Sequence, residues 1–278
     1  MQEEIKVSLI ASSVRPKLYE SFFKSLEGTS VEYEVVFAGN LEKDKIRSIS
    51  GWIGASLSRG NQPNYQYIIT KNIKPAQCYE IARRHAEGEL IHWTADDAEY
   101  KGDILGHAYR YWKKQNNEKL ILSLQTREFY LGGGDGFCDM HNHSFIGGDP
   151  KTPLMAPLGM ISRKYFEKLG GFDRRFLCGQ QENLCVMMVY ADGGMVEVFG
   201  NKTAYIEIDH VRKSIESGES KRKDDFFNRP FARGYKHDRQ ILESICKYKD
   251  GVITVESFEP FEEKDLLTKS QSYKGQWE

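Results

Sequence analysis

The stretch PAQCYEIARRHAEGELIHWTADD, residues 75–97, decides the fold class of this chain. Apolar side chains at helical spacing predict a helix over residues 75–86, and Gly88 ends it. The apolar run 90–94 then predicts a buried strand that leads directly into the acidic pair Asp96 and Asp97. In an open α/β sheet, ligands bind at the loops that leave the carboxyl ends of the strands. The sequence therefore predicts an α/β protein with its acidic pair at the edge of a binding site.

The alternation of strand and helix extends in both directions from this stretch. Upstream, IKVSLIA at residues 5–11 predicts a first buried strand, and a helix over 17–26 and a strand over 33–38 complete a β-α-β opening. A glycine-rich run, Gly132 to Gly136, is expected to begin a long flap-like loop reaching Pro157. Further strands are expected over 65–70, 120–125, 158–161, 195–198 and 203–208, the last two closing the sheet, and further helices over 104–115, 163–169, 183–190 and 237–248.

The composition limits the partners and the compartment. The 39 Lys and Arg residues balance 40 Asp and Glu residues, so no overall positive field favours a phosphate backbone, and nucleic acid is a disfavoured partner. The five cysteines are scattered and contain no C-x-x-C pair, which indicates a reducing compartment. No signal peptide is evident and no apolar stretch approaches the ~18 residues that span a bilayer. We therefore expect a cytoplasmic protein that is at most peripheral to the inner face of a membrane.

Several separate segments resemble one known family when they are taken in order. The first strand runs into ASSVRP at 11–16, the 75–94 segment leads to TADD at 94–97, and LGMI at 158–161 precedes FEKLGGFD at 166–173. In this order they resemble three features of the family 2 glycosyltransferases of the GT-A fold. These are the nucleotide-binding loop, a DXD-type metal motif whose first acid is replaced, and the GGFD acceptor-side segment. The resemblance covers roughly residues 5–212.

The resemblance implies a fold, a domain division and an activity. The implied fold is a Rossmann-like three-layer α/β/α arrangement with a mixed central sheet. Residues 1–212 would form the glycosyltransferase domain, with a nucleotide-binding half (1–100) and an acceptor-side half (101–212), and residues 213–278 a helical and irregular appendage packed on it. The implied activity is inverting transfer of a hexose or related sugar from a UDP- or GDP-sugar to a glycan, lipid-linked or small-molecule acceptor.

The implied cofactor is a divalent ion, Mn²⁺ or Mg²⁺. A hard cation held by one or two carboxylates neutralises a leaving diphosphate. Asp96 and Asp97 are the expected ligands, and His210, at the end of the 203–208 strand, resembles the histidine that completes the metal shell in related enzymes. Adjacent residues on an extended segment point opposite ways, so Asp96 is the first choice. The alternatives are an acidic pair in a solvated turn and a histidine that makes one hydrogen bond.

An inverting transfer also needs a general base to take the proton of the acceptor hydroxyl. Many family members have an acidic pair soon after the GGFD segment, but here residues 179–183 read GQQEN, which leaves Glu182 as the available carboxylate. Glu182 is therefore the candidate catalytic residue. The alternative is that its charge only favours the start of the following helix. Asp173 and Asp149 are the next candidates for the base.

The donor nucleotide and sugar would meet residues near the ends of the first strands and of the 90–94 strand. A guanidinium suits bidentate contacts with phosphate, and a lysine acts as a point charge. The candidate donor-binding residues are Ala11, Ser13, Arg15, Asn40, Lys74 and Asp96.

Other functions stay open at this point. A nucleotidyltransferase is disfavoured because no G-x-G-T-R-like loop follows the first strand. A catalytically degenerate module that only binds nucleotide or sugar is an alternative, since Gln180 and Gln181 stand where acids are expected. A glycosyltransferase acting on modified DNA is another, and it would need a local basic patch around 163–164 and 174–175.

Overall fold

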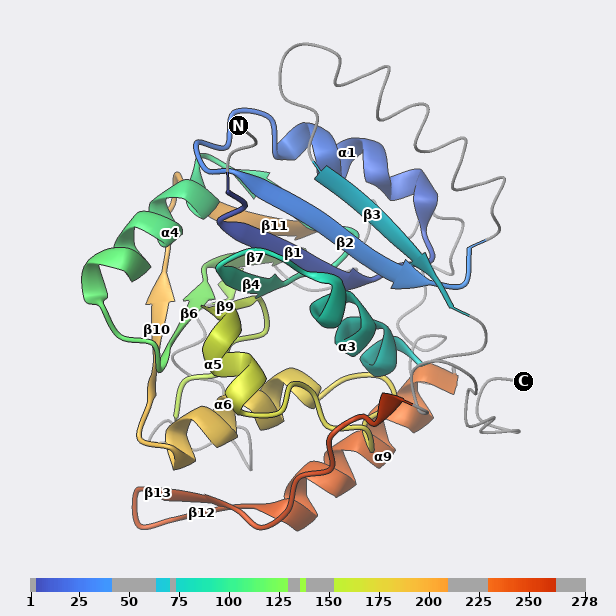
Figure 1. Cartoon of the computed structure of the whole chain (residues 1–278), viewed down its shortest axis with the longest axis vertical. Helices are drawn as coiled ribbons and strands as arrows, with labels where there is room; N and C mark the ends of the chain where they lie inside the picture. Colours follow the sequence, from blue (N-terminus) through green and yellow to red (C-terminus); the bar gives the residue numbers. More distant parts are fainter. Residues whose placement is uncertain are drawn as a thin grey trace.

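The computed structural model of the chain describes residues 4–41, 64–70, 74–129, 136–138, 153–209 and 230–263. A seven-stranded sheet lies at its centre, in the order β10-β6-β9-β4-β1-β2-β3 (Figure 1). Strand β9 runs antiparallel to both of its neighbours, and the other pairs are parallel. The strands are β1 (Val7–Ser12), β2 (Tyr33–Gly39), β3 (Asn64–Ile69), β4 (Leu90–Trp93), β6 (Leu120–Leu124), β9 (Gly159–Ser162) and β10 (Met195–Phe199). The mixed central sheet expected from the sequence is confirmed.

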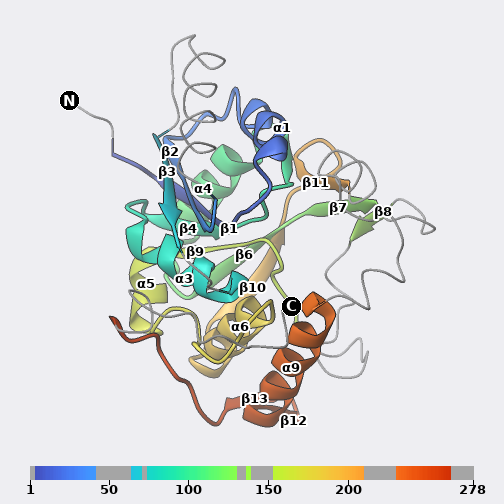
Figure 2. The ribbon, with the colours of Figure 1, turned by 90° about the vertical axis from the view of Figure 1, so that its right-hand side faces the viewer.

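Helices cover both faces of this sheet. A 3-10 turn η1 (Pro16–Leu18), α1 (Tyr19–Ser25) and α4 (Ile104–Gln115) lie on one face. The opposite face carries α3 (Pro75–His85), α5 (Arg163–Lys168) and α6 (Gln181–Ala191). Figures 1 and 2 show the two groups separated by the strands, which gives the three layers of the expected α/β/α arrangement.

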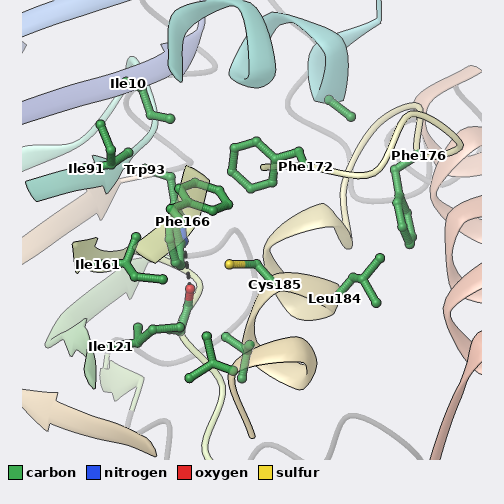
Figure 3. Packing of buried hydrophobic residues seen from close by; sticks show 14 of the residues in the cluster. Ile10, Ile91, Trp93, Ile121, Ile161, Phe166, Phe172, Phe176, Leu184 and Cys185 are labelled. Atoms are coloured by element: carbon green, nitrogen blue, oxygen red, sulfur yellow. Dashed lines mark hydrogen bonds between the residues drawn. The ribbon is translucent and has the colours of Figure 1, made fainter. Parts of the chain in front are cut away.

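The strand residues alternate between two buried clusters, as the two-residue period of a strand requires. On β1, Leu9 faces the cluster under α1 and α4, whereas Ile10 faces the cluster under α3, α5 and α6. The second cluster is built around Trp93, Phe166 and Phe172, whose rings meet edge to face (Figure 3). The Trp93 indole N–H donates to the carbonyl of Ala156 at 2.8 Å, so this buried polar atom is satisfied.

A second, four-stranded sheet lies beside the first, in the order β5-β11-β7-β8. It contains β5 (Glu99–Lys101), β11 (Tyr205–Asp209), β7 (Thr126–Phe129) and β8 (Gly136–Cys138). The strand expected at 203–208 therefore forms, but the prediction that it closes the central sheet is wrong. Of the expected loop from Gly132 to Pro157, residues 136–138 form β8, residues 153–157 are without helix or strand, and the rest lie outside the described residues.

The C-terminal segment forms α9 (Pro230–Ile245) and a hairpin of β12 (Cys246–Lys249) and β13 (Val252–Val255). The helix expected to reach residue 248 ends at Ile245 because the next residues pair in this hairpin. Its turn is Asp250-Gly251, both at positive φ, which is the turn chemistry that two-residue hairpins prefer. In both views α9 lies beside α6, and Leu242, Ile245 and Phe261 join the cluster of Trp93 (Figures 1 and 2).

Two further findings concern the described residues only. None of their helices is long and apolar enough to cross a membrane. Four cysteines, Cys78, Cys178, Cys185 and Cys246, are buried there as free thiols.

Candidate functional site

The candidate site lies where β1 and β4 end side by side. These parallel strands pair Ile10 with Trp93, so the loops that follow them leave the same edge of the sheet. The amide of Thr94 donates to Ile10 at 2.9 Å, and the amide of Ser13 donates to Ala38 on β2 at 2.9 Å. Backbone hydrogen bonds therefore fix the starts of both loops before any side chain contributes.

A buried charged cluster connects the two loops. The Ser13 hydroxyl donates to Oδ2 of Asp96 at 2.6 Å, and Arg15 donates from Nε to Oδ1 of Asp96 at 3.0 Å. Arg15 Nη2 also contacts Oδ1 of Asp96, and Arg15 Nη1 lies 3.1 Å from Oδ2 of Asp97. Asp96 and Asp97 are 2% and 4% exposed. One guanidinium thus compensates two nearly buried carboxylates.

The electrostatics of Asp96 reflect this crowding. Burial raises the pKa of Asp96 above its ordinary value, Arg15 opposes the rise, and the neighbouring charge of Asp97 adds to it. The hydrogen bond from Ser13 also favours the ionised form. The cluster is balanced only while a cation faces it, so any ligand that draws Arg15 away must leave another positive charge in its place.

A divalent ion does not fit the cluster as it is arranged. Carboxylate oxygens are suitable donors for Mg²⁺ or Mn²⁺. However, both oxygens of Asp96 already accept hydrogen bonds, and Arg15 pairs with Asp97 as well. No group of three or more His, Cys, Asp or Glu side chains suited to a metal occurs in the described part of the chain, and His210 lies outside it. An ion would have to displace Arg15 before it reached these oxygens.

Tyrosine hydroxyls hold Ser13 in place. The Tyr19 and Ser13 hydroxyls are hydrogen-bonded at 2.6 Å, and the Tyr67 hydroxyl donates to the Ser13 carbonyl at 2.7 Å. A Cβ on Gly39 would overlap that same carbonyl, so the end of β2 needs a residue without a side chain. The position of Ser13, and through it that of Asp96, is therefore set from three directions.

A second carboxyl, that of Glu182, lies in the first turn of α6. Its Oε2 atom is buried and has no hydrogen-bond partner among the described residues. Burial raises the pKa of Glu182 to about 7, against the opposing effect of backbone amides of Gln180 and of Glu182 itself. A carboxyl with this pKa exchanges a proton near neutral pH, which is what a general base or acid requires. Gln180, just before it, adopts a φ of 67°, a conformation that is rare for a residue with a side chain.

Tyr79 of α3 interacts with the acidic loop and with Glu182. Its hydroxyl donates to the Thr94 carbonyl at 2.5 Å, at the start of the acidic loop. Burial raises the pKa of Tyr79, and the charges of Glu182, Asp96 and Asp97 raise it further. The pKa of this one phenol therefore depends on the charges of all three acids. Tyr79 is not among the site residues predicted from the sequence; the sequence signal that was available is its place on the helix that leads to the acidic motif.

Among the other predicted site residues, Ala11, Asn40 and Asp173 take no part in the charged cluster. Lys74 is buried just before α3, and burial lowers the pKa of its amino group while Cys178 opposes this effect. The Ala11 side chain belongs to the core under α1, and Asn40 is exposed beyond β2. Asp173 accepts from Arg175 and from the amide of Glu259, which occupies its carboxylate. Asp149 lies outside the described residues.

Comparisons with known proteins bear on the fold. No family model and no curated protein sequence matches the chain. Among solved structures, the chain is similar to S. aureus TarS 1-349 in complex with UDP, with a TM-score of 0.56 and 15% identity over 88% of this chain and 76% of that one. The same TarS fragment in complex with UDP-GlcNAc gives a TM-score of 0.56 and 17% identity over 86% of this chain and 71% of that one.

Two further structures are similar over a smaller share of their own length. GalNAc-T7 with UDP, GalNAc and Mn²⁺ gives a TM-score of 0.54 and 10% identity over 74% of this chain and 43% of that one. Against another TarS structure the TM-score is 0.54 at 15% identity, and the match covers 77% of this chain but 38% of that one. At these identities the likeness shows the fold: the chain has the mixed α/β fold of the GT-A glycosyltransferases.

Proposed function

We propose that the chain is a glycosyltransferase that moves a sugar from a nucleotide-diphosphate donor to an acceptor hydroxyl, with inversion. The observation that carries the proposal is the buried cluster of Ser13, Arg15, Asp96 and Asp97 at the carboxyl ends of β1 and β4. The Glu182 carboxyl interacts electrostatically with Tyr79, whose hydroxyl donates to the start of the same acidic loop. Charge compensation for a leaving diphosphate and a proton acceptor are the two functions that such a transfer needs. The fold supports the proposal because a site at the carboxyl ends of β1 and β4 is where an open α/β sheet binds ligands.

In the proposed reaction Glu182 is the catalytic base. Its carboxylate takes the proton of the acceptor hydroxyl while that oxygen bonds to the anomeric carbon. The bond between this carbon and the diphosphate breaks, and the electron pair leaves with the nucleotide diphosphate. The buried Oε2 of Glu182 supplies a proton acceptor that water does not compete for. With a pKa of about 7, the Glu182 carboxyl gains and loses a proton near neutral pH.

Arg15 has the complementary role at the donor. Its guanidinium holds Asp96 and Asp97 before the donor binds, and its five N–H donors suit a diphosphate as well as a carboxylate. Mn²⁺ or Mg²⁺, expected from the sequence, enters the proposal as a competitor of Arg15 for the two carboxylates. Asp96 and Asp97 are the residues that would hold such an ion, and it would supply positive charge to the leaving diphosphate. The Mn²⁺ in the GalNAc-T7 structure supports including the ion.

The donor class proposed is a UDP-sugar, and the proposed acceptor is a glycan, a lipid-linked sugar or a small molecule. UDP and UDP-GlcNAc are bound in the TarS structures, which supports uridine over guanosine as the nucleotide. We further propose that residues 213–278 belong to the same unit as residues 1–212, because α9 shares a buried cluster with α6.

The experiment that tests this function is a transfer assay on the wild type and on Glu182→Gln. UDP-sugars are supplied with a mixture of simple glycoside acceptors, and release of UDP is measured. Loss of the base should lower kcat about 10²–10⁴-fold with the donor Kd unchanged, because Gln keeps the size of the side chain. Full turnover in Glu182→Gln would show that Glu182 is not the catalytic base. Nucleotide binding without turnover in the wild type would favour a binding module instead.

A further inference from the structure

Asp238 of α9 binds the loop that precedes Glu182. It is fully buried, at 0% exposure, although it lies on a helix far along the chain. Its carboxylate accepts hydrogen bonds from the backbone amides of three consecutive residues: Leu177 at 2.9 Å, Cys178 at 2.6 Å and Gly179 at 3.0 Å. Successive amides that converge on one anion form a compact and specific cradle. The carboxylate of Asp238 therefore fixes the backbone of 177–179.

The next residue carries the constraint into α6. Gln180 has a φ of 67°, and its carbonyl accepts a hydrogen bond from the amide of Leu184 at 3.0 Å. Gln180 therefore sets the direction in which α6 starts. A second contact with α9 holds it, because the side chains of Tyr235 and Gln180 are hydrogen-bonded. A Cβ on Gly234 would overlap the Cys178 sulfur, so α9 approaches the loop as closely as a glycine permits. The direction of Glu182, two residues after Gln180, thus depends on α9.

The groups that face Glu182 come from three helices. Tyr79 approaches from α3, Cys185 from α6 itself, and Tyr235 and Asp238 from α9. Among them Asp238 is the acid, and its charge raises the pKa of Glu182. The contact between α9 and the 177–180 loop therefore has an electrostatic as well as a geometric effect on the proposed base.

We propose that Asp238 is a positioning residue that sets the place of the Glu182 carboxyl through the 177–180 backbone, so that α9 is a part of the reaction site. This inference rests on the proposed function for its catalytic meaning, but its structural content stands without it. It assigns a role to the segment that the sequence alone marks as an appendage.

The test compares Asp238→Asn with the matched control Glu243→Gln, which removes a charge from the exposed side of the same helix. A loop that is no longer held by a charged carboxylate should misplace Glu182 and lower kcat about tenfold to a hundredfold, while the donor KM stays within about twofold. Loss of the Asp238 charge should also move the acid limb of the pH–rate profile to lower pH. Glu243→Gln should match the wild type in kcat, in donor KM and in the position of the acid limb.

Two additions keep the test decisive. Asp238→Glu retains the charge but lengthens the arm, so it should lower kcat with little movement of the acid limb, and it serves if Asp238→Asn fails to fold. The ¹³C signal of the Glu182 carboxyl, identified by its loss in Glu182→Gln, should titrate at lower pH in Asp238→Asn.

The NMR titration separates failure of this inference from failure of the proposed function. If the wild type transfers no sugar but the Glu182 titration moves, the proposed function fails and the coupling stands. If the titration and kcat of both Asp238 variants equal those of the wild type, the inference is overturned.

Discussion

Removal of the Arg15 guanidinium should destabilise the protein by an amount that depends on pH. Arg15→Gln leaves Asp96 and Asp97, 2% and 4% exposed, close together without their cation. Removing one partner of a buried ion pair costs about 3–5 kcal/mol. The Arg15 side chain is 25% exposed, and solvent screening reduces the expectation to about 1–3 kcal/mol. At ~2–4 °C per kcal/mol for a chain of this size, the Tm should fall by roughly 2–12 °C.

The sign of the pH dependence follows from the carboxylates. The pKa of Asp96 is raised in the folded state, first by burial, and loss of the Arg15 charge raises it further. A raised carboxyl pKa means that the folded state binds protons more tightly than the unfolded state does. The resulting stability is fully present below the unfolded pKa and is lost as pH rises through the folded pKa. Arg15→Gln should therefore lose more stability at about pH 8 than at about pH 5.

Differential scanning calorimetry at both pH values measures this effect. Arg110→Gln is the control, because it removes an arginine from a solvent-exposed ion pair with Asp103 and should cost less than about 1 kcal/mol. Adding Mn²⁺ should stabilise Arg15→Gln more than the wild type, since no guanidinium then competes with the ion for the two carboxylates. If Arg15→Gln has the same Tm as Arg110→Gln at both pH values, with and without Mn²⁺, the assignment of Arg15 as the compensating charge is refuted.

Two further predictions concern the base and the GGFD turn. Wild-type transfer should rise with pH through about 7, because Glu182 accepts a proton only when ionised, and this limb should vanish in Glu182→Gln; a limb below about pH 5.5 in the wild type would exclude Glu182. Gly171→Ala should lower the free energy of unfolding by about 1–3 kcal/mol in urea melts, because its φ is 82° and an added Cβ would meet the Glu80 carboxylate. Gly193→Ala, with φ 74° and open space, is the control and should cost less; equal costs would mean that the Glu80 contact is unimportant.

The sequence could predict those parts of the fold that rest on local pattern. The strands at Val7–Ser12 and Leu90–Trp93 are mostly apolar runs, and α3 between them has helical spacing. Their order alone indicates an open sheet with the acidic pair at its edge. Strands β5 (EYK) and β7 (TREF) are short and also carry charged residues, so they show neither an apolar run nor a period. The β12–β13 hairpin did have a signal in Asp250-Gly251, which the helical interpretation of 237–248 overrode.

The contacts within the site could not be predicted from the sequence, and the reason is different. Arg15 and Asp96 are 81 residues apart, and which of several acids a long guanidinium reaches depends on the tertiary packing of the loops. Asp238 and the 177–179 amides are separated by about 60 residues, and backbone amides leave no mark in a sequence at all. Candidate residues could be named from their chemistry, but their partners could not.

The most direct test of the account is calorimetric titration of UDP and GDP, with and without Mn²⁺, into the wild type and Asp96→Ala. Thermal melts of both proteins establish that the variant is folded. We expect UDP to bind the wild type and binding to be lost in Asp96→Ala, because the Asp96 carboxylate that organises Ser13 and Arg15 is then absent. Equal UDP binding by both proteins, or binding of neither nucleotide by the wild type, would contradict a nucleotide-sugar site at this edge of the sheet.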